Sequence, residues 1–495
     1  MKKSNLKLCS LILLLTLVLP LLLISCDGDN KTVSDVSVTT SSSENLVPHL
    51  GKADYTGKTL TILATHKTST YGEAQIAPEE LTTEPVNDAF YERNQQLKQE
   101  YGFNIKCLYN DGFTKLEEQI RTDINADQNE YDIVASGVQT LALMAEEGYF
   151  YDLYKLPNSK LQLDKDWWDT KLLADLSIAH KLFFATGDIF VNDDEYTCVT
   201  YFNKTIIENN NLDNPYDLVK EGKWTLDTMY EMVKTAAKED GDGTMNVTGG
   251  DVWGMVSYAF DCYKYVVGCN NPQVYKNEET DIPYLAMTEP QAITSFDKVF
   301  DMFMDKSRVA WTEQYYSWDH AEAATVVNNF YNGKALFFAG RIEAVSSESM
   351  KNSTIKYGIL PIPKYDENQE RYTSVVDPYH FYCLSVVNNA KDIEFSTFAI
   401  EAMAYLSKKM VTPEYYNRTL QLKRFDDQDS AEMLDIIFSN RIADLSIIFN
   451  WNDCIQYYNN MLFSNSKDIV SYMDARKEAF NTEMNATLEA IGALD

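Results

Sequence analysis

Between residues 59 and 147, β-branched apolar runs alternate with amphipathic helical runs, and this alternation constrains the fold more than any other feature. Strand-like runs occupy residues 59–65, 103–109 and 131–135. The segments between them space apolar residues three, four or seven apart, as helices do. Thr114 and Glu117 form a capping box at one helix start. A turn at 136–137 is expected before the last helix. The pattern predicts an α/β fold with a parallel sheet.

In parallel sheets of this kind, ligands bind at the carboxyl ends of the strands. The loops at those ends are residues 66–71, 110–113 and 136–139. Further strand-like runs follow, and Thr225 is placed to cap a helix. These later runs lie at 196–202, 335–338, 356–360, 374–376 and 382–387.

The N-terminus has the form of an export signal. Lysines at positions 2, 3 and 7 precede an apolar run, 8–24, that is short for a membrane-spanning helix. The run ends in Leu-Ile-Ser-Cys26, which resembles the lipobox of bacterial lipoproteins. We therefore predict that Cys26 carries lipid. The alternative is a cleaved secretory signal with an incidental cysteine at that position.

The charge of the chain and its cysteine spacing argue against certain classes of partner and site. The 495 residues include 43 Lys and Arg against 74 Asp and Glu, a formal net charge of −31. Such a surface repels phosphate backbones, so we expect no nucleic-acid partner. No Cys-x-x-Cys pair is present, which argues against a zinc ribbon or a thioredoxin-like centre. Cys262 and Cys269 have a spacing that neither requires nor excludes a disulfide.

The sequence carries no positive signal for an enzyme. It lacks the zinc-protease, nucleophile-elbow, phosphate-loop and dinucleotide-binding motifs, and its five histidines are scattered. We expect neither catalysis nor a cofactor. An acidic loop, Asp240, Asp242, Asn246 and Asp251, has oxygen donors that suit calcium. It fits an EF-hand register poorly, because Lys238 stands at the first acid position, so we favour an acidic turn and predict no metal.

Several motifs, taken in order, resemble one family. Residues 131–135 and 147–153 (EGYFYDL) are similar to its strand and "G-x-L-x-D-L" helix end, and 200–204 (TYFNK) to its "Y-N-K" crossing strand. Residues 222–225 (GKWT) resemble its "P-x-T-W-x-E" helix start. Residues 333–337 and 357–361 resemble its "G-K-A-A-M … G-x-x-P-x-P" stretch. The chain thus resembles the extracellular solute-binding proteins of bacterial ABC importers, in the maltose- and oligosaccharide-binding branch.

The resemblance implies two α/β lobes, made of discontinuous segments and joined by crossing strands around a ligand cleft. It implies a protein that passes a carbohydrate to ABC permease subunits, and we expect a monomer. The lipid anchor would hold it on the outer face of the plasma membrane in a single-membrane cell, whereas in a two-membrane cell Asp27 would favour retention at the inner membrane. The expected order is a signal peptide at 1–25, a lipidated tether at 26–54, lobe 1 at 55–198 and 376–420, lobe 2 at 199–375, and a return to lobe 2 with C-terminal helices at 421–495.

The same resemblance implies a set of ligand-binding residues by position. Arg341 would enter the cleft, where its fork suits ring hydroxyls or a uronate carboxylate, and Trp451 would offer a late stacking platform. The full set is His66, Lys67, Ser136, Gln139, Tyr196, Tyr258, Phe260, Arg341 and Trp451.

Two classes of function follow from the sequence. The first is a binding lipoprotein that captures an extracellular carbohydrate, with a peptide or other non-sugar solute as the variant within that class. The second is a surface lipoprotein that hydrolyses glycans, because two carboxylates can in principle cleave a glycosidic bond. With 74 Asp and Glu in the chain, however, a pair arises by chance. Turnover separates the two classes, because a binding protein leaves an oligosaccharide intact.

Overall fold

The alternating N-terminal pattern folds into the expected parallel arrangement. In the computed structural model, β1 (Thr59–Thr65) lies between β2 (Asn104–Asn110) and β3 (Ile133–Gly137), and all three run parallel. A fourth strand, β12 (Tyr382–Val386), joins β3 antiparallel and gives the order β12-β3-β1-β2. The structure describes residues 45–65, 76–315, 321–422 and 428–492. The prediction of an α/β fold is confirmed.

Two local predictions in this region are wrong. Ser136 and Gly137 were expected to form a turn, but they are the last residues of β3, paired with Cys383 and Tyr382. The helix α2 (Phe113–Asn125) begins directly after Gly112 with no side-chain cap, so the Thr114 capping box does not form. At the end of β3 the long-range pairing with β12 outweighs the local turn signal.

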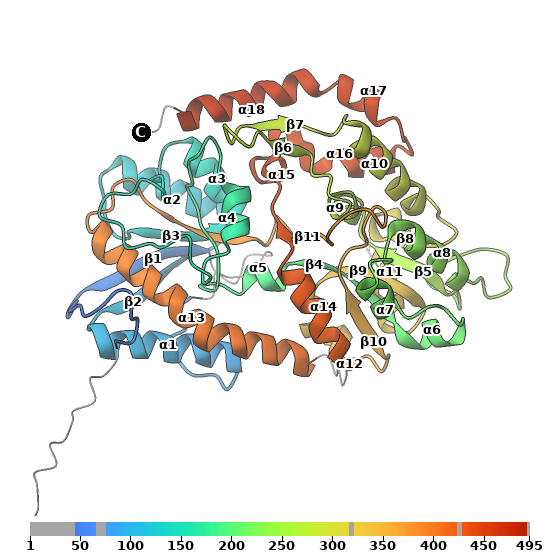
Figure 1. Cartoon of the computed structure of the whole chain (residues 1–495), viewed down its shortest axis with the longest axis horizontal. Coiled ribbons are helices and arrows are strands. Elements are labelled where there is room, and N and C mark those ends of the chain that lie inside the picture. The colour runs from blue at the N-terminus through green and yellow to red at the C-terminus, as the bar shows by residue number, and fades with distance from the viewer. Residues whose placement is uncertain (1–44, 66–75, 316–320, 423–427, 493–495) are drawn as a thin grey trace, which may run out of the picture. The chain divides into compact units, whose positions relative to one another are not determined.

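Helices pack on this first sheet. Helix α1 (Pro85–Tyr101) begins with Glu84, whose side chain accepts the N–H of Asn87, and it ends at Gly102. Gly102 has φ +80°, and a Cβ there would come within 2.4 Å of Thr56, so only glycine fits. The long helix α13 (Ile393–Leu422) lies beside α1 (Figure 1). Helix α3 (Val138–Glu146) follows β3 directly.

A second sheet has mixed topology. Its order is β10-β4-β9-β5-β8, and Thr225 caps α8 (Leu226–Ala236) as predicted, with its side chain accepting the N–H of Thr228 at 3.3 Å. Strand β4 is antiparallel to β9 and β10, whereas β5 is parallel to β8 and β9. The strands are β4 (Cys198–Asn203), β5 (Trp253–Ser257), β8 (Val309–Trp311), β9 (Ala335–Arg341) and β10 (Tyr357–Leu360). The helices beside them include α9 (Asp261–Gly268), α10 (Pro290–Phe303) and α11 (Ala321–Tyr331).

The chain passes between the two sheets repeatedly. It leaves the first through α5 (Asn192–Glu195) into β4, and it returns through β11 (Ser374–Val375) into β12. It then crosses again, because α14 (Gln428–Phe438) packs on β10 and is followed by β13 (Arg441–Ile442), which pairs parallel with β11. The C-terminal helices are α15 (Leu445–Phe449), α16 (Tyr457–Phe463), α17 (Ile469–Asp474) and α18 (Lys477–Gly492).

The packed chain begins earlier than the predicted start at Tyr55. Val47 is fully buried, and its N–H donates to the hydroxyl of Tyr101. His49 stacks on Trp167 with ring centres 4.8 Å apart and lies 3.0 Å from the buried carboxylate of Glu401. The end of the segment predicted as a tether therefore belongs to the fold. Among the helices of the described ranges, none has the length and apolar character needed to cross a membrane.

Candidate functional site

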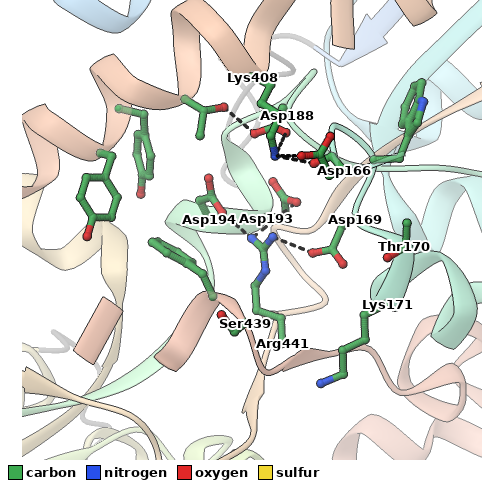
Figure 2. A pocket seen from close by; sticks show the side chains of 16 residues that line it. Asp166, Asp169, Thr170, Lys171, Asp188, Asp193, Asp194, Lys408, Ser439 and Arg441 are labelled. Atoms are coloured by element: carbon green, nitrogen blue, oxygen red, sulfur yellow. Dashed lines mark hydrogen bonds and ion pairs between the residues drawn. The ribbon is translucent and has the colours of Figure 1, made fainter. Parts of the chain in front are cut away.

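One charged cavity, of about 510 Å³, lies where α5, α13 and β13 meet. Here the guanidinium of Arg441 points at three carboxylates (Figure 2). Its Nη2 is 2.6 Å from Asp169, and its Nη1 contacts Asp194 and lies 3.6 Å from Asp193. Because these carboxylates converge on an internal cation, we interpret the cluster as a structural tie between segments that are distant in sequence.

A second cavity, of about 420 Å³, is built at strand ends of the second sheet, and we call it the Arg341 pocket. The end of β5 and the start of α9 supply Tyr258, Phe260, Asp261 and Lys264, while the end of β9 supplies Arg341. The loop between β11 and β12 adds Asp377 and Tyr379. Further lining residues are Glu313, Tyr331, Phe338, Ala339, Gly340, Glu343, Ala344 and Ser347.

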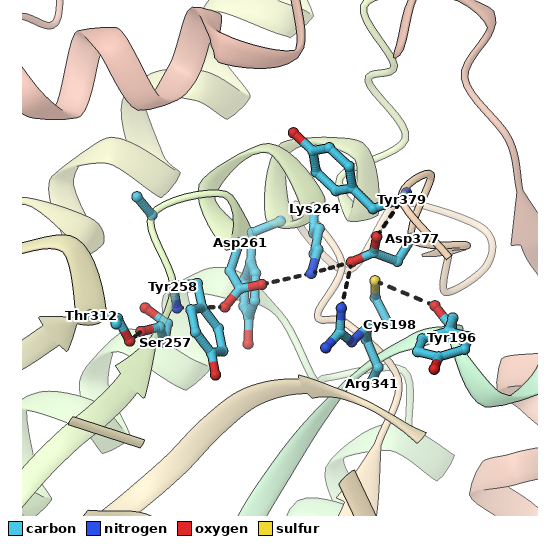
Figure 3. A network of polar contacts seen from close by, with 12 residues as sticks. Tyr196, Cys198, Ser257, Tyr258, Asp261, Lys264, Thr312, Arg341, Asp377 and Tyr379 are labelled. Atoms are coloured by element: carbon cyan, nitrogen blue, oxygen red, sulfur yellow. Dashed lines mark hydrogen bonds and ion pairs between the residues drawn. The ribbon is translucent and has the colours of Figure 1, made fainter. Parts of the chain in front are cut away.

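Ion pairs organise the floor of this pocket around Asp377 (Figure 3). Asp377 is 2% exposed and lies 3.1 Å from Lys264 and 3.2 Å from Arg341. Lys264 also pairs with Asp261 at 2.9 Å, and Arg341 with Glu343 at 2.9 Å. Burial alone would raise the pKa of Asp377, but the two cations outweigh it and hold the pKa well below its usual range. The network fixes the polar side chains of the pocket in place.

Aromatic rings form the walls. Phe260 stacks on Tyr263 with centres 5.2 Å apart and meets Tyr379 edge-on at 5.4 Å. Tyr258, one residue beyond the end of β5, is 38% exposed. An exposed aromatic face beside fixed carboxylates is the arrangement that stacks on an apolar ring face and accepts hydrogen bonds from its hydroxyls.

A smaller cavity of about 230 Å³ continues from the same loop toward the first sheet. Tyr379 lines both cavities, and Gln139 at the start of α3 lines the smaller one. The Nε2 of Gln139 donates to the carbonyl of Ile447 at 2.9 Å, so its orientation is fixed by α15. Elements of both sheets thus contribute to adjoining cavities.

The structure brings together five of the residues predicted for binding. Tyr258, Phe260 and Arg341 line the Arg341 pocket, and Gln139 lines its smaller neighbour. The ring of Tyr196 lies beneath Arg341 at 5.5 Å and stacks on His380 at 4.3 Å. The guanidinium of Arg341 is engaged by Asp377 and Glu343, which argues against the expected role in binding a uronate.

Ser136 lines neither of these two cavities. Ser136 is fully buried in β3, where its hydroxyl shares a hydrogen bond with Thr65 at 2.8 Å. His66, Lys67 and the lipid acceptor Cys26 lie outside the described residues.

Trp451 requires a correction, because it is a core residue in this structure. It is 2% exposed, its indole N–H donates to Thr487 at 2.8 Å, and its ring stacks on Phe449 with centres 5.4 Å apart. Phe480 of α18 covers it edge-on. It lines neither cavity described above, so it cannot serve there as a stacking platform.

The sequence reasoning missed the charged residues that organise the pocket. Asp261 and Lys264 sit three apart at a helix start, and Asp377 directly follows the strand-like run at 374–376. The last of these was a usable signal, because the predicted boundary between lobe 2 and the second part of lobe 1, at 375–376, falls within this run. Nothing local links Asp377 to Lys264, which lies 113 positions earlier.

The acidic loop and the two cysteines can also be placed. In the loop, Glu239, Asp240 and Asp251 bring carboxylate oxygens within 4.8 Å of one another. Asp251 already accepts the backbone N–H groups of Asp240 and Asn246, at 2.9 and 2.6 Å, so these acids brace their own turn. Asp242 is not in the group, and the choice of an acidic turn over a calcium site stays a prediction. Cys262 and Cys269 are separate buried thiols.

Comparison with known proteins agrees with this architecture. Residues 77–412 match the model of a family described as bacterial extracellular solute-binding protein. A cyclo/maltodextrin-binding protein complexed with maltotetraose is 14% identical, with TM-score 0.55, over 90% of this chain and 99% of that one. The sugar-binding protein MalE of Xanthomonas citri is 12% identical, with TM-score 0.54, over 88% and 98%. RafE in complex with raffinose is 16% identical, with TM-score 0.50, over 86% and 99%.

At these identities the solved structures establish the shared two-lobe fold. No curated protein matches the chain in sequence. The family match covers about two thirds of the residues, and it includes the second sheet, the Arg341 pocket and the strands β2, β3 and β12 of the first sheet. The chain therefore belongs to the family of bacterial extracellular solute-binding proteins.

Proposed function

We propose that this protein is the substrate-binding lipoprotein of an ABC importer and that it captures an extracellular carbohydrate. The observation that carries the proposal is the Arg341 pocket, which sets an exposed aromatic face, Tyr258, beside carboxylates held by ion pairs. Relatives of the same fold were solved with maltotetraose and with raffinose, which supports a sugar ligand.

The binding residues that we propose come from both sheets. Tyr258, Phe260 and Tyr379 would stack on sugar faces, and Gln139 would contact the part of the ligand nearest α3. A ligand that touches both sets favours the closed arrangement of the lobes by its higher affinity for that arrangement. The permease would then recognise the closed protein. Arg341 acts as a positioning residue, because its donors hold Glu343 and Asp377.

Calorimetry with a panel of neutral oligosaccharides tests this proposal. Tyr258→Ala should weaken the binding of the sugar so identified by about ten- to a hundred-fold, through loss of a stacking face. Tyr284→Ala is the matched control, because Tyr284 is a similarly exposed tyrosine, on β7 (Pro283–Leu285), and should leave affinity unchanged.

The outcomes decide between the functions left open by the sequence. Binding of a peptide but of no sugar would replace carbohydrate by another solute. New reducing ends after incubation with glycans would favour the hydrolase. We expect the sugar to be recovered intact.

Membrane attachment through Cys26 is part of the proposal. It rests on the sequence alone, through the basic start, the apolar run and the Leu-Ile-Ser-Cys26 junction. Cys26→Ser should release the protein from the membrane or leave the signal uncut. A variant that remains at the membrane with its signal removed would overturn the anchoring.

A further inference from the structure

The charge of the Arg341 pocket carries an inference about the kind of sugar it takes. Among the described residues that line it, four carry carboxylates and two carry positive charges. The carboxylates are Asp261, Glu313, Glu343 and Asp377. His380 bonds to Asp377 outside the lining, and even a protonated His380 leaves the sum negative. A pocket with an excess of one sign concentrates ligands of the other.

The two cations are committed within the protein. Lys264 is 5% exposed and bridges Asp261 and Asp377. Arg341 bridges Asp377 and Glu343. An acidic sugar would have to break one of these pairs and leave a buried carboxylate without its partner, which is costly. The pocket is therefore unsuited to uronates.

Two of the carboxylates keep capacity for a ligand. Glu343, whose side chain is 27% exposed, gives Oε1 to Arg341. Its Oε2 is covered in this arrangement and meets no hydrogen-bond donor among the described residues, so a ligand amine reaches it by rotation of the carboxylate. Glu313 accepts the backbone N–H of Ala259 at 2.7 Å, and burial raises the pKa of its carboxyl. An unsatisfied buried acceptor is unfavourable, and a charged donor relieves it more than a neutral hydroxyl does.

We propose that the preferred ligand is an amino sugar, whose protonated amine is received by Glu343 in the pocket that Glu313 also lines. An ammonium group offers three donors and no acceptor, which matches a pocket rich in acceptors. The faces of the surrounding tyrosines and Phe260 also favour a cation. Lys264 already lies over the ring of Phe260, at 5.4 Å. This inference rests on the proposed function, since it assigns the class of sugar bound at the same site.

Three trisaccharides with the same β-1,4 backbone test the proposal by calorimetry at pH 5.5. They are cellotriose, its 2-amino counterpart (the glucosamine trimer) and the corresponding triuronic acid. We expect the glucosamine trimer to bind about ten-fold or more tightly than cellotriose, as for a charge-assisted hydrogen bond, and the triuronic acid not to bind. Glu343→Gln should reduce the preference for the amine, taken as the ratio of the two affinities, to less than three-fold.

Glu348→Gln is the matched control, because Glu348 lies five residues further on with a side chain that is 85% exposed, and it should alter neither affinity. Cellotriose or another neutral oligosaccharide bound as tightly as its amino counterpart would overturn the inference and leave the proposed function standing. A persistent amine preference in Glu343→Gln would also overturn it. If no sugar of any charge binds, the proposed function fails, and this inference fails with it.

Discussion

At the scale of single residues, Asp377 is the residue on which the pocket's order depends. It is fully buried, and it faces both Lys264 and Arg341. Asp377→Asn would remove the shared anion and leave two charges in the interior with fewer partners. Removing one member of a buried pair costs about 3–5 kcal/mol. We therefore expect the free energy of unfolding to fall by about that amount in urea denaturation.

Glu343→Gln provides the comparison at the same site. Its side chain is 27% exposed and pairs only with Arg341 among the described residues, so its replacement should cost under about 1 kcal/mol. Equal losses in the two variants would contradict the central role of Asp377.

Trp451 gives the second prediction at this scale. Its ring is enclosed by Phe449 and Phe480, and its N–H is satisfied by Thr487. Trp451→Ala should lower the free energy of unfolding by about 3–5 kcal/mol through the cavity it leaves. Affinity for the sugar should be unchanged in calorimetry below the melting point. A loss of affinity without a loss of stability would return Trp451 to the binding site.

At the scale of elements, the local sequence pattern predicted those strands whose ends are determined by neighbouring residues. The strands β1 and β2 were placed to within one residue, because their apolar runs are bounded by clear breaks. The end of β3 was missed, since it is decided by pairing with β12, almost 250 residues away. The same limit applies to Trp451, because its flanking residues are equally compatible with a buried core position and with an exposed stacking position. Tyr258 and Phe260 were found because the family resemblance supplied a register that composition does not contain.

The cavity around Arg441 lies where α5, β13 and α13 meet, and it gives a prediction about pH. Asp188 lies in this cavity, where it accepts a hydrogen bond from Thr412 at 2.6 Å and lies 3.6 Å from Lys408. Burial raises the pKa of Asp188 to about 6. The folded state thus holds this proton more tightly than the unfolded chain. The contribution of Asp188 to the free energy of unfolding of the wild type is therefore lost as pH rises from about 4 to 6.

Asp188→Asn has no proton to lose there. The free energy of unfolding of the variant, relative to that of the wild type, should rise by at most about 3 kcal/mol between about pH 4 and 6. Above this window the difference should stay constant. Urea denaturation at several pH values measures this difference. Asp166→Asn is the control, because Asp166 lies beside the same Lys408 with a side chain that is 76% exposed, and it should show no such trend. A difference that shrinks with rising pH would contradict the assignment.

At the scale of the folded unit from Leu46 onward, one contiguous hydrophobic core includes residues of both sheets and of the C-terminal helices. Helices α15 and α18 contact α3 of the first sheet's layer, while α16 contacts α9 beside the second. Because the core is shared, loss of packing at one sheet would expose apolar surface of the other. We therefore expect calorimetry to show a single unfolding transition, although two lobes are present.

Ligand binding should move that transition as a whole. A sugar that binds only the native state, at a free concentration of 100 times its Kd, adds about 2.7 kcal/mol to the free energy of unfolding. The whole peak should then shift upward without splitting. Tyr258→Ala should unfold at the wild-type temperature without sugar, because Tyr258 is 38% exposed, and should shift less at the same sugar concentration. Two transitions, with only one moved by ligand, would show that the lobes unfold separately and that the shared core does not couple them.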